Sequence, residues 1–218
     1  MERLTPAQRH MRKVSAQLAH SKECELLANS TEYEKMLYLL TRHKKDLKKI
    51  QSMELKAAYK KRIIVDYLPW IEGALSSGNG SQDNVLMTWQ VWAIDCEEYH
   101  LALQIAEYAL HQQLKLPEPF TRTLGTMLAE EFADHAKVAQ LANKNFEISY
   151  LERVAYLVKD EDMPDESRAR LYRELGLLKM DTDPKNALAT LERALALDKN
   201  IGVKGEVRKL RKQLNKPD

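Results

Sequence analysis

Residues that interrupt helices are scarce in this chain, and this scarcity limits most strongly what it can fold into. Seven glycines and seven prolines are spread over 218 residues, and helix-favouring residues such as Ala, Leu, Lys, Glu and Gln dominate the remainder. A protein built from turns and strands needs more Gly and Pro than this. The hydrophobic fraction of 44% is enough to form a core. The sequence therefore predicts an all-α protein of one large or two small domains.

Capping motifs and chain breakers divide the chain into expected helices. Thr5-Pro6-Ala7-Gln8 predicts a first helix to about Leu27, and Thr31-Glu32-Tyr33-Glu34 is a capping box that opens a second. We expect the second helix to continue to Leu68, where Pro69 breaks or kinks it. Its apolar residues recur close to every seventh position, and about 37 residues would span about 55 Å. A helix of that length cannot bury its apolar stripe within one small chain, so self-association through a helical-hairpin or coiled-coil-like region is predicted.

Charge is distributed unevenly, although the net charge is only +2. Residues 1–62 carry fifteen Lys/Arg against seven Asp/Glu, residues 63–198 carry twelve against twenty-three, and residues 199–218 carry seven against two. A solvated basic face is the commoner meaning of such a segment, but nine cations among residues 42–62 favour a polyanion such as DNA. The side chains predicted to contact DNA are Arg9, His10, Arg12, Lys13, Arg42, Lys44, Lys45, Lys48, Lys49, Lys56, Lys60, Lys61 and Arg62.

The loop-forming residues 76–84 mark the expected boundary between this basic region and a body of shorter helices. Within the body we expect helices near 86–93, 101–110, 121–143, 147–158, 171–178 and 187–198. The last two resemble a tetratricopeptide unit, with signature-like residues Tyr172, Leu175, Gly176, Ala187, Leu191 and Ala194. The predicted organisation is a DNA-binding and oligomerisation region over 1–75, a linker over 76–84, a helical-hairpin body over 85–200 and a basic C-terminal helix or tail over 201–218.

Few residues of the sequence suggest a disulfide, a metal site or a catalytic site. Cys24 and Cys96 lie far apart, which predicts reduced thiols and neither a disulfide nor a zinc site. No apolar run reaches the length of about 20 residues that spans a bilayer, so no membrane partner is expected. Glu131, Asp134 and His135 have helical spacing and are the weak candidates for metal-assisted catalysis, although exposed helix faces often carry such clusters. The acidic run at 160–162 is expected to cap the next helix rather than to bind metal, and no metal site is predicted.

Six stretches of the chain form a recognisable series. They are Pro6-Ala7-Gln8-Arg9-His10-Met11, Tyr33-Glu34-Lys35-Met36-Leu37, Glu54-Leu55-Lys56-Ala57-Ala58, Leu68-Pro69-Trp70, Gln82-Asp83-Asn84-Val85-Leu86-Met87-Thr88 and Asp162-Met163-Pro164-Asp165-Glu166. In their order and spacing, from about Thr5 to Leu214, they resemble the small terminase subunit of P-two-like tailed phages. The resemblance implies viral DNA packaging in the host cytoplasm. It further implies a small subunit that recognises the cohesive-end packaging site, assembles as a ring-like homo-oligomer and delivers DNA to the large subunit, which holds the ATPase. By position, Arg9-His10 falls in the first basic helix and Lys56 in the second.

Three functions follow from this sequence. The leading hypothesis is a DNA-recognition subunit that is not itself catalytic and needs no cofactor. The second is a metal-dependent endonuclease that uses Mg²⁺ to cut the packaging site, since small subunits of this family are commonly labelled as the endonuclease subunit. The third is a tetratricopeptide-like adaptor that binds the large terminase subunit through residues 82–200 and has no role in DNA binding.

Overall fold

The protein is helical wherever its structure is described. The computed structural model describes residues 30–78 and 80–215, and these ranges form ten α-helices and one 3-10 turn, with no strand. The prediction of an all-α fold is confirmed, whereas the helix expected over residues 5–27 lies outside the described residues. The elements are α2 Glu32–Lys49, α3 Met53–Ile63, η1 Ile64–Asp66, α4 Leu68–Ser77, α5 Asn84–Asp95, α6 Tyr99–His111, α7 Leu124–Leu141, α8 Ile148–Leu157, α9 Asp165–Lys179, α10 Pro184–Leu197 and α11 Lys204–Leu214.

The chain divides into two units between Gln51 and Ser52. Helix α2 is the described helix of the first unit, and the second unit, residues 52–218, contains α3 to α11. Residues 76–84, where we expected a linker, connect α4 to α5 inside the second unit. The regional assignments over 1–75, 85–200 and 201–218 stay predictions about function.

The single long helix expected over residues 31–68 is wrong. Helix α2 ends at Lys49 because Ile50 adopts an extended conformation, with φ −88° and ψ 128°. Ser52 then caps a new helix by accepting a hydrogen bond from the backbone N–H of Leu55, at 3.3 Å. Pro69 does not end a helix but lies in the first turn of α4, a position where its missing N–H costs nothing.

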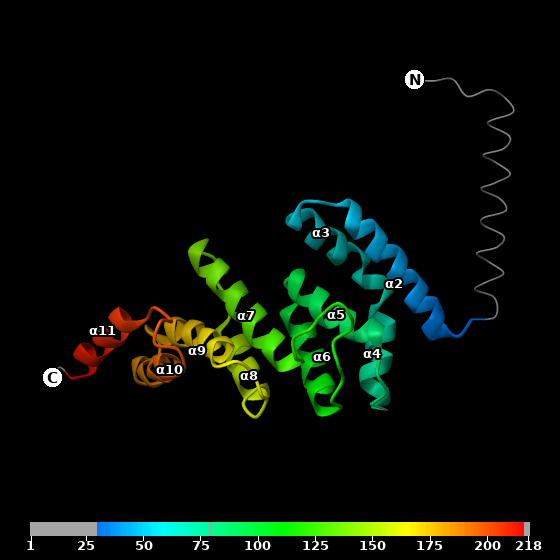
Figure 1. The fold of residues 1–218 in the computed structure, drawn as a ribbon. Helices are drawn as coiled ribbons and strands as arrows, with labels where there is room; N and C mark the ends of the chain where they lie inside the picture. The colour runs from blue at the N-terminus through cyan, green and yellow to red at the C-terminus, as the bar shows by residue number, and fades with distance from the viewer. Residues whose placement is uncertain (1–29, 79, 216–218) are drawn as a thin grey trace, which may run out of the picture. The chain divides into compact units, whose positions relative to one another are not determined.

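The second unit is built from helices that pack mainly on near neighbours in the sequence (Figure 1). Helix α5 pairs with α6, α7 contacts α8 and α9, and α9 pairs with α10, which in turn carries α11. Side-chain caps begin several of these helices, including Asp83 for α5, Thr123 for α7 and Asp183 for α10.

The pair α9 and α10 matches the helical hairpin expected over residues 171–198. Gly176 allows the two helices to approach closely, because a Cβ atom at this position would lie 2.6 Å from Cδ2 of Leu191. Leu191 itself is fully buried. The two helices therefore pack closely at this position, and the tetratricopeptide-like arrangement of successive pairs stays a prediction.

Aromatic and aliphatic side chains fill the core of the second unit. Trp89 is fully buried between Tyr67 and Trp92, with ring centroids 5.0 and 5.3 Å away. Trp70 is half-buried and donates its indole N–H to Asp83 at 2.7 Å. Trp89 and Trp92 are therefore core residues, which a DNA base could not reach for stacking.

Candidate nucleic-acid interface

Helix α2 is positioned by local signals that were visible in the sequence. Thr31 and Glu34 form the predicted capping box, in which Thr31 accepts from the Glu34 backbone and Glu34 accepts from Thr31. These hydrogen bonds lower the pKa of Glu34, which keeps a negative charge at the helix N-terminus. Lys48 and Lys49 occupy the last turn, where cations favour the helix dipole.

The exposed side of α2 carries a cluster of cations that we call the α2 arc: Arg42, Lys45, Lys48 and Lys49. At 3.6 residues per turn these four positions span about 120° of the helix circumference. All four are exposed to solvent. Leu40 and Leu47, which are one heptad apart, are buried and lie on the other side of the helix. The helix is thus amphipathic, with its charged side facing water.

The surroundings of Lys49 and Lys44 affect how readily these two cations of α2 can contact a phosphate. Lys49 forms an ion pair with Asp46 at 2.7 Å, one turn away on the helix, and such an exposed pair is weak enough to open for a phosphate. Lys44 is half-buried at the edge of the apolar side, and loss of hydration lowers its pKa. Lys44 is therefore the predicted α2 contact that is least suited to meeting DNA.

Two of the predicted DNA-contacting cations of α3 form ion pairs within the second unit, Lys60 as a buried side chain and Lys61 as an exposed one. Lys60 is only 8% exposed, pairs with Asp95 of α5 and lies 5.6 Å from the centre of the Trp92 ring. Lys61 pairs with Glu98 at 3.3 Å. The residues around Lys60 do not indicate its partner, because Asp95 is 35 residues away in the sequence.

The remaining predicted contacts have different settings. Lys56 is partly exposed, and Arg62 is exposed with its guanidinium carbon 5.0 Å from the ring centre of Tyr59. The predicted cations of residues 42–62 do not lie along one helix, because α2 and α3 are separate helices and Lys60 faces inward. Arg9, His10, Arg12 and Lys13 lie outside the described residues.

The three weak catalytic candidates do not converge on one point. Glu131 lies 3.6 Å from Arg122, and burial raises its pKa, with help from nearby acidic groups. His135 shares a 2.8 Å hydrogen bond with the hydroxyl of Tyr99, and burial lowers its pKa. Asp134 is exposed. Across residues 30–78 and 80–215, no group of three or more His, Cys, Asp and Glu side chains could hold a metal ion.

The acidic run at 160–162 is organised by an arginine instead of a metal. Arg168 donates hydrogen bonds to the backbone carbonyls of Val158 and Glu161, at 3.1 and 2.5 Å. The N-cap position of the next helix is taken by Pro164, so the acidic run does not cap it as expected. Asp165 and Glu166 lie in the first turn of that helix and stabilise its N-terminus through the dipole.

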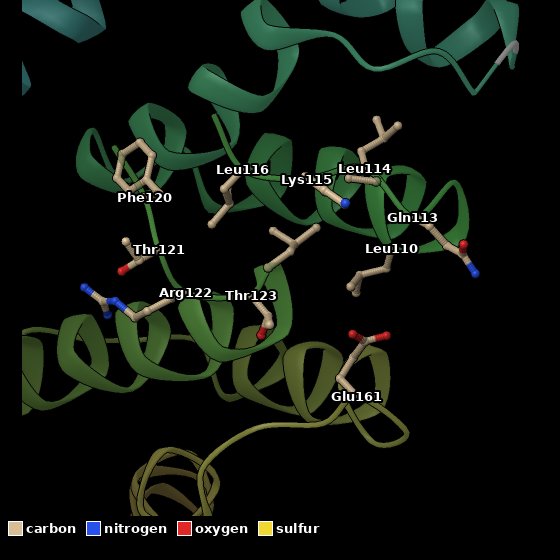
Figure 2. A pocket seen from close by; sticks show the side chains of 12 residues that line it. Leu110, Gln113, Leu114, Lys115, Leu116, Phe120, Thr121, Arg122, Thr123 and Glu161 are labelled. Atoms are coloured by element: carbon tan, nitrogen blue, oxygen red, sulfur yellow. The ribbon is translucent and has the colours of Figure 1, made fainter. Parts of the chain in front are cut away.

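A cleft of about 550 Å³ opens between the end of α6, the connection that follows it and the start of α7 (Figure 2). Its apolar lining includes Leu110, Leu116 and Phe120, and Arg122 and Glu161 border it. Glu161 is the single carboxylate in this lining, which contains neither His nor Cys. The charged side chains of this lining are Lys115, Arg122 and Glu161.

No described helix is both long enough and apolar enough to cross a membrane. Among the described residues, Cys96 is buried as a free thiol, and burial raises its pKa to about 12, so it is a poor nucleophile or metal ligand. Cys24 lies outside the described residues.

Comparisons with known proteins agree with the resemblance seen in the sequence. The family model for the phage small terminase subunit matches residues 37–166, a range that includes the whole α2 arc. A protein of Escherichia phage P2 named "Terminase, endonuclease subunit" is 41% identical over 216 residues, which cover 98% of this chain and 87% of that relative. No solved structure matches the chain.

Proposed function

Because the chain belongs to the phage small terminase subunit family, whose role is the packaging of viral DNA, we propose that it binds the cohesive-end packaging site through the α2 arc. It then presents the bound DNA to the large terminase subunit. The site of action is the cytoplasm of the infected host cell.

The exposed α2 arc is the observation that carries this proposal. Four cations project from one side of a helix whose other side is apolar, so they can approach phosphates without disturbing the core. From Arg42 to Lys49 the helix rises about 10 Å, a length that can follow a few phosphates of one strand. Neutralised phosphates release counterions, which supplies the binding free energy and makes it depend on salt. This mechanism positions the protein on the duplex, and base contacts would add sequence preference.

A ring-like homo-oligomer is the second part of the proposal. Val138 and Leu141 are 64% and 76% exposed on the last turns of α7, and we assign this exposed apolar pair to a contact with another subunit. An oligomer multiplies the α2 arc, because each copy contributes four more cations. DNA binding itself needs no cofactor in this mechanism.

Neutralising the α2 arc tests the proposal directly. Replacing Arg42, Lys45, Lys48 and Lys49 with Ala should lower the affinity for duplex DNA that carries the packaging site by on the order of 1,000-fold at 0.1 M salt. The slope of log K against log salt should decrease in magnitude by about 3 to 4 per bound protomer. A matched control replaces Lys115, Lys144, Lys159 and Lys185, four lysines of the second unit outside α3 and α11, with Ala. Equal affinities for the arc variant and the control would contradict the proposal.

The endonuclease alternative rests on the name of the phage P2 relative, "Terminase, endonuclease subunit". If this chain cuts DNA with Mg²⁺, purified protein should cleave a packaging-site duplex, and Glu131→Ala or Asp134→Ala should abolish the cleavage. Cleavage that persists in both variants would remove these two carboxylates from the reaction. Docking to the large terminase subunit through residues 82–200 is tested separately, by asking whether the α2 arc variant still captures that subunit.

A further inference from the structure

The last described helix, α11, is rich in basic residues, and among the described residues only its Arg211 forms an ion pair with another helix. Among its eleven residues are Lys204, Arg208, Lys209, Arg211 and Lys212, against the single acid Glu206. It terminates a unit whose preceding residues, 63–198, are strongly acidic. The sequence suggested a basic C-terminal helix or tail without giving it a role.

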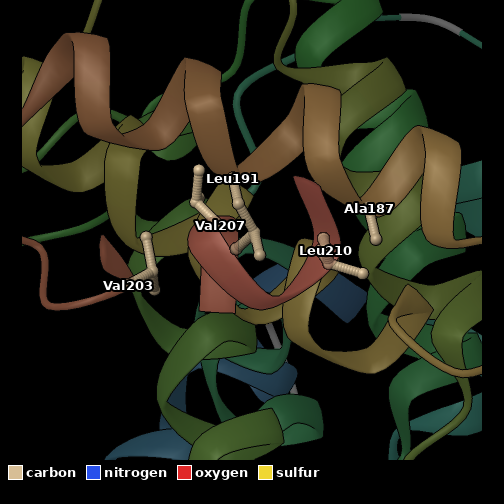
Figure 3. Close-up of a cluster of buried hydrophobic side chains, with 5 residues drawn as sticks. All are labelled: Ala187, Leu191, Val203, Val207 and Leu210. Carbon is tan, nitrogen blue, oxygen red and sulfur yellow. The ribbon is translucent and has the colours of Figure 1, made fainter. Parts of the chain in front are cut away.

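Helix α11 is fixed in place by its apolar side. Val203 just before the helix, together with Val207 and Leu210 within it, packs against Ala187 and Leu191 of α10, and all five side chains are buried (Figure 3). The spacing of four and three residues puts the three anchors on one side of the helix. The cations are therefore displayed by a firmly packed helix, and little conformational entropy of the backbone is lost when a ligand binds.

Three of the cations form a regular row, which we call the α11 row: Lys204, Arg208 and Lys212. They recur every four residues, so they lie along one side of the helix at intervals of about 6 Å. All three are exposed. Arg211, by contrast, is held by Glu192 of α10 through two hydrogen bonds of 2.6 and 2.8 Å. The structure thus separates Arg211, which fastens α11 to α10, from the α11 row, and Lys209 is exposed beside that row.

We propose that the α11 row is a second DNA-contact surface, which binds phosphates of the duplex independently of the α2 arc. This inference rests on the proposed DNA-binding function and adds a contact surface on the second unit. An evenly spaced line of cations suits the repeating charge of a DNA strand. The row contains no apolar side chain to act as the buried anchor on which protein interfaces depend. Arg208 can also donate two hydrogen bonds to one phosphate.

Measurement of the salt dependence of DNA binding tests this surface. In the full chain, Lys204, Arg208 and Lys212 are replaced with Ala, which preserves helix propensity and leaves the anchors Val203, Val207 and Leu210 intact. The slope of log K against log salt should decrease in magnitude by about 2 to 3 per bound protomer, and affinity at 0.1 M salt should fall by on the order of 100-fold. The control variant replaces Lys115, Lys144 and Lys159 with Ala, which removes the same charge outside α11.

Each outcome distinguishes the two surfaces. If the wild-type chain binds DNA and the α11 row variant matches the control variant, the α11 proposal is wrong and the α2 arc proposal stands. If the row variant binds DNA normally but sedimentation shows weakened self-association, the row contacts another copy of the chain, which also overturns the proposal. If the wild-type chain does not bind duplex DNA at all, the proposed function fails together with this inference. Additive losses in a variant lacking both surfaces would support two independent contacts.

Discussion

Helices α2 and α3 carry cations at similar density but use them differently. Along α2, Lys45 and Lys48 extend into solvent, opposite a buried apolar side. Along α3, Lys60 and Lys61 face Asp95 and Glu98 and hold the helix to its neighbours in the second unit. The contrast teaches that charge density along a sequence does not define a binding surface. The groups that face each cation decide whether it stabilises the fold or meets a ligand.

The largest expected effect on stability comes from Lys60. Lys60→Met removes the cation that compensates Asp95 and should lower the free energy of unfolding by about 2 kcal/mol, less than the loss for a fully buried pair because Asp95 is partly exposed. Lys45→Met on α2 should change it by less than about 0.5 kcal/mol. Urea unfolding at pH 7 measures both. Lys60→Met should leave the intrinsic affinity for DNA unchanged. A loss of DNA affinity in the folded variant would show that Lys60 contacts DNA, and α2 and α3 would then not differ in how they use their cations.

Replacing Ser52 tests whether its N-cap hydrogen bond separates α2 from α3. Ser52→Ala removes the side chain that accepts a hydrogen bond from the N–H of Leu55 and should lower the free energy of unfolding by about 1 kcal/mol. Ser76→Ala, at an exposed position within α4, should cause no loss because Ala favours helices. Thermal unfolding followed by circular dichroism compares the two variants. An unchanged or increased stability of Ser52→Ala would show that the cap does not separate α2 from α3.

A smaller effect is expected from the enclosed imidazole of His135. Burial lowers its pKa below the ordinary value of 6.5, although the nearby Asp95, Glu97 and Asp134 oppose this shift. The unfolded chain therefore takes up a proton first as pH falls, so the contribution of His135 to stability is present above pH 6.5 and decreases below it. Between pH 7.5 and 5.5 the wild type should lose more stability than His135→Gln, in urea unfolding at both pH values. An equal loss in the two proteins would show that His135 does not cause the pH dependence.

The smallest effect is expected for the exposed pair of Lys61 and Glu98. Lys61→Ala should change the free energy of unfolding by less than about 0.5 kcal/mol, because water screens a pair whose side chains are 62% and 40% exposed. The same urea experiment that measures Lys60→Met provides the comparison. A loss as large as that of Lys60→Met would mean that the two paired cations of α3, Lys60 and Lys61, stabilise the fold equally, which would sharpen the contrast with α2.

Local signals in the sequence predicted most helices of the second unit but not the relations between distant residues. The capping box at Thr31 and the small residue Gly176 were interpreted correctly, because each acts on its immediate neighbours along the chain or on the adjacent helix. The break at residues 50–52 was missed, since a heptad-like pattern continues across it and a Ser at position 52 is a modest signal. The pattern of apolar residues described burial on each side of the break without indicating that the helix stops.

The candidate site was less predictable than the fold for the same reason. The density of positive charge identified the α2 arc. The partner of Lys60, however, is Asp95, which lies 35 residues away, and the residues around Lys60 do not indicate this pairing. The helical spacing of Glu131, Asp134 and His135 suggested a shared face, yet their side chains find separate partners or solvent. A row such as Lys204, Arg208 and Lys212 is visible as a spacing of four, but its exposure depends on how α11 packs on α10.

The neighbour-to-neighbour packing of the second unit has a consequence for how the protein is made. Each principal contact joins helices that are adjacent or separated by one helix in the sequence, such as α5 with α6, α7 with α9 and α10 with α11. Short loops between contacting segments close quickly, so a chain of this topology is expected to fold fast. Helices can pack in the order in which they leave the ribosome, and apolar side chains are exposed only briefly. Few copies of the chain would then be lost to aggregation before they have folded.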